Sequence, residues 1–117
     1  MEDKTLQMTM LLDFYGELLT PKQRDTVALR YNDDLSLAEI AEEMGITRQG
    51  ARDLLVRAES TLMKTEEKTG IVRRFTEQRA ALDRIDEILS RLISMTDGPA
   101  QELAQSLRSE LAGIRNN

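Results

Sequence analysis

Apolar residues recur at every third or fourth position along most of the chain, which is the spacing of one face of an α-helix. In the first segment this spacing predicts a helix within residues 4–19. Its packed face is expected to carry Leu6, Met10, Phe14 and Leu18, with Leu11 and Tyr15 beside them. Gly16 weakens the last turn, because glycine loses more backbone freedom in a helix than other residues do.

Two capping signals mark the starts of the next helices. Thr20 with Gln23, and Ser36 with Glu39, have the spacing of a capping box, in which the two residues satisfy each other's backbone N–H groups. The first box predicts a helix over residues 21–31. The second predicts a short helix that begins directly after Ser36.

The short helix is followed at once by another. Gly45 ends it, because glycine adopts left-handed backbone without steric cost, and Thr47 caps the next helix two residues later. The inward positions of both helices are apolar: Leu37, Ile40, Ala41 and Met44, then Ala51, Leu54, Leu55, Ala58 and Leu62. This combination predicts a helix-turn-helix, although an ordinary helical hairpin has the same pattern.

A longer seam follows Gly70, with alternating steps of three and four residues as in helices that pack lengthwise. Its members are Phe75, Gln78, Leu82, Ile85, Leu89 and Leu92. After a turn at residues 96–99, a last helix places Leu103, Leu107, Leu111 and Ile114 on one face, to fold back on its predecessor or to pack on a second copy.

These patterns predict an all-α protein. We expect a helix-turn-helix domain in residues 1–70 and a C-terminal helical extension in residues 71–117, used for packing or dimerisation. We also predict a homodimer built from the seam Phe75–Leu92, because this face is longer than a small three-helix module needs to cover itself.

The composition limits the chemistry. The chain has no Cys and no His, which excludes disulfides, thiolate metal sites and the commonest general base. An enzyme would have to work with carboxylates alone, and the many Asp and Glu fall on solvated helix faces. We therefore predict a protein without catalytic activity, metal or cofactor.

The acidic N-terminus lacks the features of a signal peptide and no apolar run could span a membrane, which predicts a cytoplasmic protein without membrane insertion.

The candidate binding residues are Thr47 itself and the outer face of the helix that follows it. At about 100° per residue, the apolar stripe leaves Gln49, Arg52, Asp53, Val56 and Arg57 facing outward, with Arg48 on the edge of the first turn. Gln49 can make a bidentate contact with adenine and Arg52 with guanine. Arg48 and Arg52 lie four positions apart, where like charges repel, so an anion such as phosphate fits between them. The alternative is that these side chains are solvated surface residues.

Other charged residues have two interpretations. Arg57 lies four positions beyond Asp53, which favours an intrahelical ion pair. Lys22 and Arg24, together with Arg30, lie on the preceding helix, where they could meet phosphates or form an ordinary solvated face.

Net charge argues against a strongly basic binding domain. The whole chain is −5, and residues 20–70 hold eight basic and ten acidic residues. A protein whose affinity rests on phosphate neutralisation is normally basic. The acids, however, concentrate before the second helix, while Arg48, Arg52, Arg57 and Lys64 outnumber Asp53 and Glu59 on it, so a local positive face can exist within a negative total.

The segment LTPKQRDTVALRYNDDLSLAEIAEEMGITRQGARDLLVRAESTL, from Leu19 to Leu62, resembles region 4 of the sigma-70 factors. The resemblance implies that residues 47–57 correspond to a recognition helix, with Gln49 and Arg52 on the base-reading face and Arg48 near the backbone. It does not extend to the other promoter-reading and polymerase-binding regions, so a sigma activity is not implied.

A closer resemblance is to the YlxM family of small bacterial proteins. It is carried by FYGELLT at residues 14–20, YNDDLSLAEIAEEMGITRQGARD at residues 31–53 and EEKTGIVRRF at residues 66–75. Because genes of this family tend to lie beside those for the signal recognition particle and its receptor, the resemblance implies a regulatory part in that pathway.

Two functions follow as expectations. In the first, the helix after Thr47 binds nucleic acid, either DNA or the RNA of the signal recognition particle. In the second, the same corner is a protein adaptor, and the acidic face of Glu39, Glu42 and Glu43 meets a basic partner such as a protein of that particle.

Overall fold

The computed structural model describes residues 2–116, and Met1 and Asn117, the outer limits of the two predicted domains, lie outside the described residues. Within this range the chain is helical and has no strand, which confirms the all-α prediction. The elements are α1 (Glu2–Tyr15), the 3₁₀ turn η1 (Gly16–Leu18), α2 (Pro21–Tyr31), α3 (Leu37–Met44), α4 (Arg48–Thr69), α5 (Ile71–Met95) and α6 (Gly98–Arg115). They form two compact units, Met1–Val72 and Arg73–Asn117.

The local signals act where the sequence places them. In the first capping box, Thr20 Oγ1 accepts the N–H of Gln23 at 3.2 Å and Gln23 Oε1 accepts the N–H of Thr20 at 3.1 Å. In the second, the bonds between Ser36 and Glu39 are 3.1 and 2.8 Å long. The α-helical part of the first segment ends at Tyr15, and the chain tightens into the 3₁₀ turn at Gly16, as the glycine predicts.

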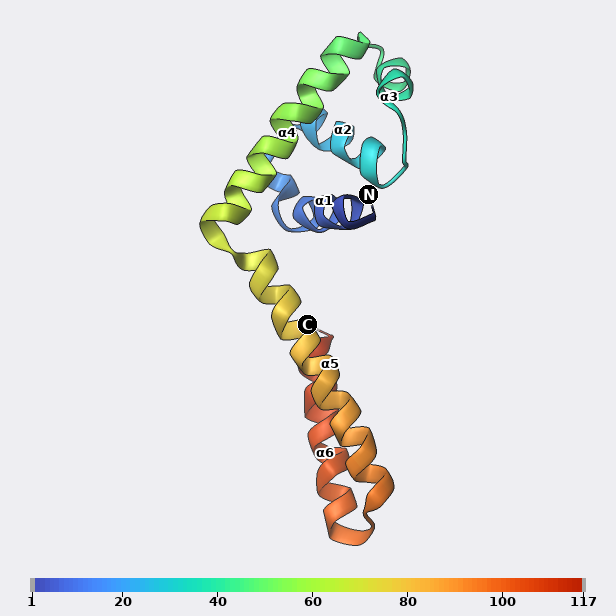
Figure 1. Cartoon of the computed structure of the whole chain (residues 1–117), viewed down its shortest axis with the longest axis vertical. Helices are drawn as coiled ribbons and strands as arrows, with labels where there is room; N and C mark the ends of the chain where they lie inside the picture. Colours follow the sequence, from blue (N-terminus) through green and yellow to red (C-terminus); the bar gives the residue numbers. More distant parts are fainter. Residues whose placement is uncertain (1, 117) are drawn as a thin grey trace. The chain divides into compact units, whose positions relative to one another are not determined.

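Three helices of the first unit share one core. Both α1 and α2 pack against α4, as Figure 1 shows. The buried side chains that meet there are Met8, Leu11, Leu12, Tyr15, Leu19, Val27, Leu55, Ala58 and Leu62. The apolar stripe of α4 thus holds α1 and α2 in place, while its N-terminal end is left for α3.

The packed face of the first segment is only partly the predicted one. Leu11 and Tyr15, predicted beside the stripe, are buried together with Met8 and Leu12, whereas Leu6 and Phe14 of α1 and Leu18 of η1 are exposed, at 63%, 40% and 63%. Apolar residues lie around much of this helix, so their spacing alone does not select a face. A polar contact does, because the Tyr15 hydroxyl bonds Glu66 Oε1 at 2.7 Å and Thr69 Oγ1 at 2.5 Å near the end of α4.

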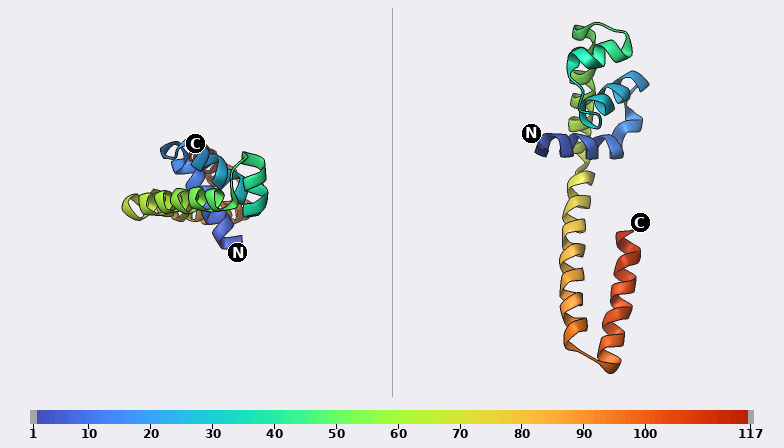
Figure 2. Two further views of the ribbon diagram at one scale, coloured as in Figure 1. Left: turned by 90° about the horizontal axis from the view of Figure 1, so that it is seen from above. Right: turned by 90° about the vertical axis from the view of Figure 1, so that its right-hand side faces the viewer.

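The second unit is an antiparallel helical hairpin, in which α6 runs back beside α5 (Figure 2). Of the two arrangements left open for the last helix, the structure has the one that folds back. The predicted faces are only partly used, since Leu89 and Leu111 are buried but Ile85, Leu92, Leu103, Leu107 and Ile114 are exposed. The reason is that α6 turns Arg108 and Arg115 toward α5, where they form ion pairs with Asp83 and Asp86.

Candidate nucleic-acid interface

A tight corner joins α3 to α4. Gly45 has φ +67° and ends α3 in the left-handed conformation that glycine adopts without steric cost. The N–H of Ile46 then donates to the carbonyl of Ala41 at 3.0 Å, and Thr47 Oγ1 accepts the N–H of Gly50 at 2.9 Å. Backbone bonds on one side and the cap on the other therefore fix the direction in which α4 leaves the corner.

Small and branched side chains fill the angle between the two helices. Ile40 and Ala51 are fully buried and Ala41 is 7% exposed. Around them pack the partly buried Leu29, Leu35, Leu37, Met44 and Ile46. Because Ala41 and Ala51 carry only a methyl group, α3 and α4 approach closely, and the corner is a rigid element rather than a hinge.

The first three turns of α4 present their other side to solvent. Arg48, Gln49, Arg52 and Arg57 are all exposed, and Val56 is 51% exposed. Thr47 is also exposed, but its hydroxyl is engaged in the cap. The structure therefore gathers all six candidate residues of this segment at one end of the unit, on or beside one face of α4.

One predicted contact on this face does not form. Within residues 2–116 Arg57 makes no ion pair, and Asp53 instead accepts a hydrogen bond from Gln49 Nε2 at 2.9 Å. The prediction of an Asp53–Arg57 pair is wrong because the carboxylate turns toward the preceding turn of the helix. As a result, Arg48, Arg52 and Arg57 have no carboxylate partner in the described part of the chain.

The candidates on α2 lie in different surroundings. Lys22 lines a surface pocket of about 480 Å³ together with Asp25, Glu43 and Met44, so acidic groups adjoin its charge. Arg24 is exposed, and no hydrogen bond or ion pair of the described residues joins it or Lys22 to the α4 face. Arg30 has a structural role, since its Nη1 donates to the Leu35 carbonyl at 3.0 Å and its guanidinium lies over the Tyr31 ring.

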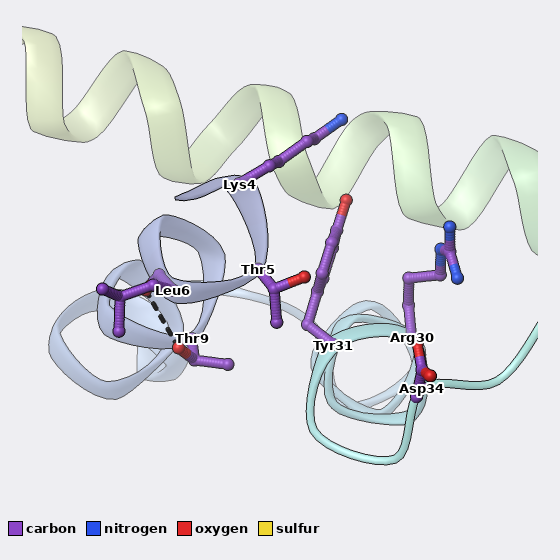
Figure 3. A pocket seen from close by; sticks show the side chains of 7 residues that line it. All are labelled: Lys4, Thr5, Leu6, Thr9, Arg30, Tyr31 and Asp34. Carbon is purple, nitrogen blue, oxygen red and sulfur yellow. Dashed lines mark hydrogen bonds between the residues drawn. The ribbon is translucent and has the colours of Figure 1, made fainter. Parts of the chain in front are cut away.

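A larger pocket, of about 660 Å³, lies between α1 and the end of α2, and sequence reasoning did not find it. Figure 3 shows Lys4, Tyr31 and Arg30 extending from its walls toward α4. The Tyr31 hydroxyl donates to Glu59 at 2.5 Å, and burial, followed by this carboxylate, holds the pKa of Tyr31 far above its usual range. Lys4 pairs with Glu59 at 3.5 Å. The cationic groups of this pocket are therefore already partnered, which leaves the α4 face as the stronger candidate for an anionic ligand.

Among the side chains that the structure describes, residues 4–116, no group of acidic residues is placed to hold a metal ion. Nor does any helix in this range have the length and apolar character needed to cross a membrane.

The short capped helix, the glycine corner and the exposed second helix define a helix-turn-helix protein. Comparison with known proteins gives the family. Residues 2–98 match the family described as "Putative helix-turn-helix protein, YlxM / p13 like", also designated UPF0122, and the chain belongs to it. The match covers the whole corner and α5 and ends at Gly98, the first residue of α6, so the rest of α6 lies beyond it.

Individual relatives agree with the family match. The chain is 45% identical over 91 residues to a UPF0122 protein of Geobacillus kaustophilus, covering 78% of this chain and 83% of the relative. It is 52% identical over 85 residues to a UPF0122 protein of Thermoanaerobacter sp., covering 73% of each chain. A UPF0122 protein of Listeria innocua is 43% identical over 91 residues, covering 78% and 83%.

Proposed function

We propose that the protein is a non-enzymatic, cytoplasmic regulator that binds nucleic acid through the exposed face of α4. The observation that carries this proposal is the set of unpaired arginines, Arg48, Arg52 and Arg57, on the second helix of a helix-turn-helix. In this class of fold the second helix enters the major groove and its first turns contact base edges. A rigid corner and unneutralised guanidinium groups are what such docking requires.

The roles of the individual side chains follow from their position. Arg52 is the residue that reads a base, since guanidinium pairs with the O6 and N7 of guanine, and Arg48, one turn earlier, contacts phosphate. Gln49 can contact adenine only after its amide leaves Asp53, to which it is bonded at 2.9 Å. Arg57 and the apolar Val56 extend the contact. Arg24 adds a phosphate contact from α2, and Lys22 adds a weaker one because Asp25 and Glu43 adjoin it.

The finer parts of the proposal are the target and the assembly. The resemblance to the YlxM family supports a role in the signal recognition particle pathway, with either DNA or the particle's RNA as the ligand. We further propose that the protein acts as a homodimer, because two copies of α4 can occupy two half-sites about one helical turn apart.

A second candidate function is supported by the surface of α3. Glu42 and Glu43 are exposed and form no ion pair within residues 2–116. This acidic face suits a basic partner, such as a protein of the signal recognition particle, in an adaptor that does not touch nucleic acid. Glu39 contributes less to it, because its carboxylate closes the capping box on Ser36.

The experiment that tests the main proposal is a titration of the whole protein against the small RNA of the signal recognition particle and against mixed duplex DNA, each at two salt concentrations. We expect one ligand to bind, with an affinity that falls as salt rises. Arg52→Ala should cost about 1–3 kcal/mol of binding free energy and change the preference at one base position.

The Arg48→Ala/Arg52→Ala variant should lose most of this binding. Its matched control is Lys64→Ala/Lys68→Ala, which removes the same charge from exposed positions far along the same helix. Equal losses in the two variants would reduce the effect to net charge. Binding of neither nucleic acid by the unmodified protein would overturn the proposal in favour of the adaptor.

A further inference from the structure

The two sides of the α5–α6 hairpin differ in chemistry. One side is closed by ion pairs, from Arg108 Nε to Asp86 at 3.4 Å and from Arg115 to Asp83 and Asp86 at 2.7 and 3.5 Å. Arg108 also donates a hydrogen bond to the Ser90 hydroxyl. These contacts fix how α6 is rotated against α5.

The other side is apolar and exposed. On α5 it carries Ile85, Ile88, Leu92 and Met95, which are 42%, 61%, 43% and 80% exposed. On α6 it carries Leu103, Leu107 and Ile114, which are 72%, 56% and 63% exposed. At about 100° per residue each set falls within one sector of its helix, about 80° wide on α5 and narrower on α6, on the flank away from the ion pairs. Because the helices are antiparallel, the two sectors open toward the same side and form a single face.

The hairpin has little core of its own. Its buried apolar side chains are Leu89, Ala104 and Leu111. A unit this small with so few buried residues needs additional apolar contacts to be stable. Single exposed apolar residues are ordinary, but a continuous two-helix face of this kind is typical of an interaction surface.

Charges along the edges of the apolar face identify what covers it. At about 100° per residue Arg84 and Arg91 lie along its α5 edge, whereas Glu110 lies along its α6 edge. All three are exposed, and none forms an ion pair in the described part of the chain. One edge is therefore basic and the other acidic.

The positions of these charges along the hairpin also match. Arg108 is level with Asp86, and Gln101 donates to the carbonyl of Ile93 at 3.0 Å. Continuing this register puts Arg84 level with Glu110. The face is thus complementary in charge to a second copy that is rotated so that its acidic α6 edge meets the basic α5 edge of the first.

We propose that a second copy of the chain covers this face, giving an antiparallel four-helix bundle with α5 of each copy against α6 of the other. The two-fold axis runs along the hairpin, and it places Arg84 beside Glu110 of the partner subunit. The alternative pairing, α5 on α5, brings arginines against arginines. This dimer rests on the proposed function only in its purpose, which is to present two copies of α4 to nucleic acid.

The first test is the molar mass of the full chain in solution, measured at micromolar concentration without nucleic acid. We expect twice the 13.3 kDa of one chain. Ile88→Lys/Leu107→Lys should give monomers. The melting transition of the first unit, followed by circular dichroism, should stay unchanged. The control, Leu18→Lys, changes a residue of similar exposure, 63%, in the first unit and should leave the dimer intact. A monomeric unmodified protein, or equal losses in variant and control, overturns the proposal.

The second test distinguishes the two pairings. Arg84→Glu should weaken the dimer on the order of tenfold, since the symmetric dimer contains the pair twice, and adding Glu110→Arg should restore it. If α5 packs on α5 instead, Arg84→Glu alone should strengthen the dimer. Because both tests use no nucleic acid, a dimer that binds none refutes the proposed function alone, and a monomer that still binds refutes this inference alone.

Discussion

The two units are both helical, but they differ in where their apolar side chains lie. The first unit buries nine apolar side chains in one cluster and three in another. The hairpin leaves seven large apolar side chains exposed on one face and buries three. Amphipathic spacing is present in both units, so the difference lies in the neighbouring helices. In the first unit α4 packs against α1, α2 and α3, whereas inside the hairpin, from Arg73 onward, α5 packs only against α6.

Polar contacts show the same contrast. In the first unit Tyr15 and Tyr31 bond Glu66 and Glu59 at 2.7 and 2.5 Å in partly buried sites, and each bond joins distant parts of the chain. The hairpin is closed by half-exposed ion pairs, and ion pairs in contact with solvent typically contribute about 0–1 kcal/mol each. The Nε of Arg115 is buried there without a hydrogen-bond partner among the described residues. The first unit is therefore expected to fold by itself. The stability of the hairpin is expected to depend on the second copy that covers its apolar face.

The largest predicted effect compares two leucines. Leu62→Ala should lower the free energy of unfolding of the first unit by about 2–5 kcal/mol, because Leu62 is fully buried. Leu107→Ala should not change this transition and should weaken the dimer instead. Both tyrosines lie in the first unit, so urea unfolding followed by tyrosine fluorescence reports on that unit selectively. Equal shifts of that transition in both variants would contradict the separation of the units.

A smaller effect compares two helix N-caps. Thr47→Ala should cost about 0.5–2 kcal/mol, since its hydroxyl accepts the N–H of Gly50 at 2.9 Å. Asp97 stands at the corresponding position of α6 but its side chain makes no capping bond, so Asp97→Ala should stay within about 0.5 kcal/mol. Tyrosine fluorescence follows the first variant and far-ultraviolet circular dichroism the second. A larger loss from Asp97→Ala would show that the hairpin relies on this terminus after all.

Local signals made most of the fold predictable from sequence. The capping boxes at Thr20 and Ser36, the corner at Gly45 and the cap at Thr47 each act through neighbours within a few residues, so sequence spacing suffices to find them. The choice of buried face on α1 and α6 could not be predicted in this way. It depends on contacts with residues distant in the chain, Glu66 for Tyr15 and Asp83 and Asp86 for Arg115.

The candidate site was predictable to the same extent. Helical periodicity alone places Arg48, Gln49, Arg52 and Arg57 on the exposed part of α4, because the opposite stripe is apolar. It does not decide which partner Asp53 takes, since Gln49 and Arg57 both lie four positions away. The pocket between α1 and α2 had no sequence signal, because its walls come from the first part of α1 and the end of α2, with the rest of both helices and η1 between them in the sequence.

The smallest predicted effect is a pH dependence of the stability of the first unit, which comes from Glu39. Hydrogen bonds from the backbone and side chain of Ser36 lower the pKa of Glu39 below its ordinary value of 4.5. A carboxylate with a lowered folded-state pKa adds stability above its ordinary pKa, and that contribution is lost as pH falls through the folded value. The tyrosine-detected urea midpoint should therefore fall between pH 5 and the acid range more steeply in the unmodified protein than in Glu39→Gln. The glutamine keeps an acceptor for the capping box but cannot titrate, as Gln23 already shows in the box on Thr20. Parallel pH profiles of the two proteins would show that the ionised form of Glu39 adds no stability to the start of α3.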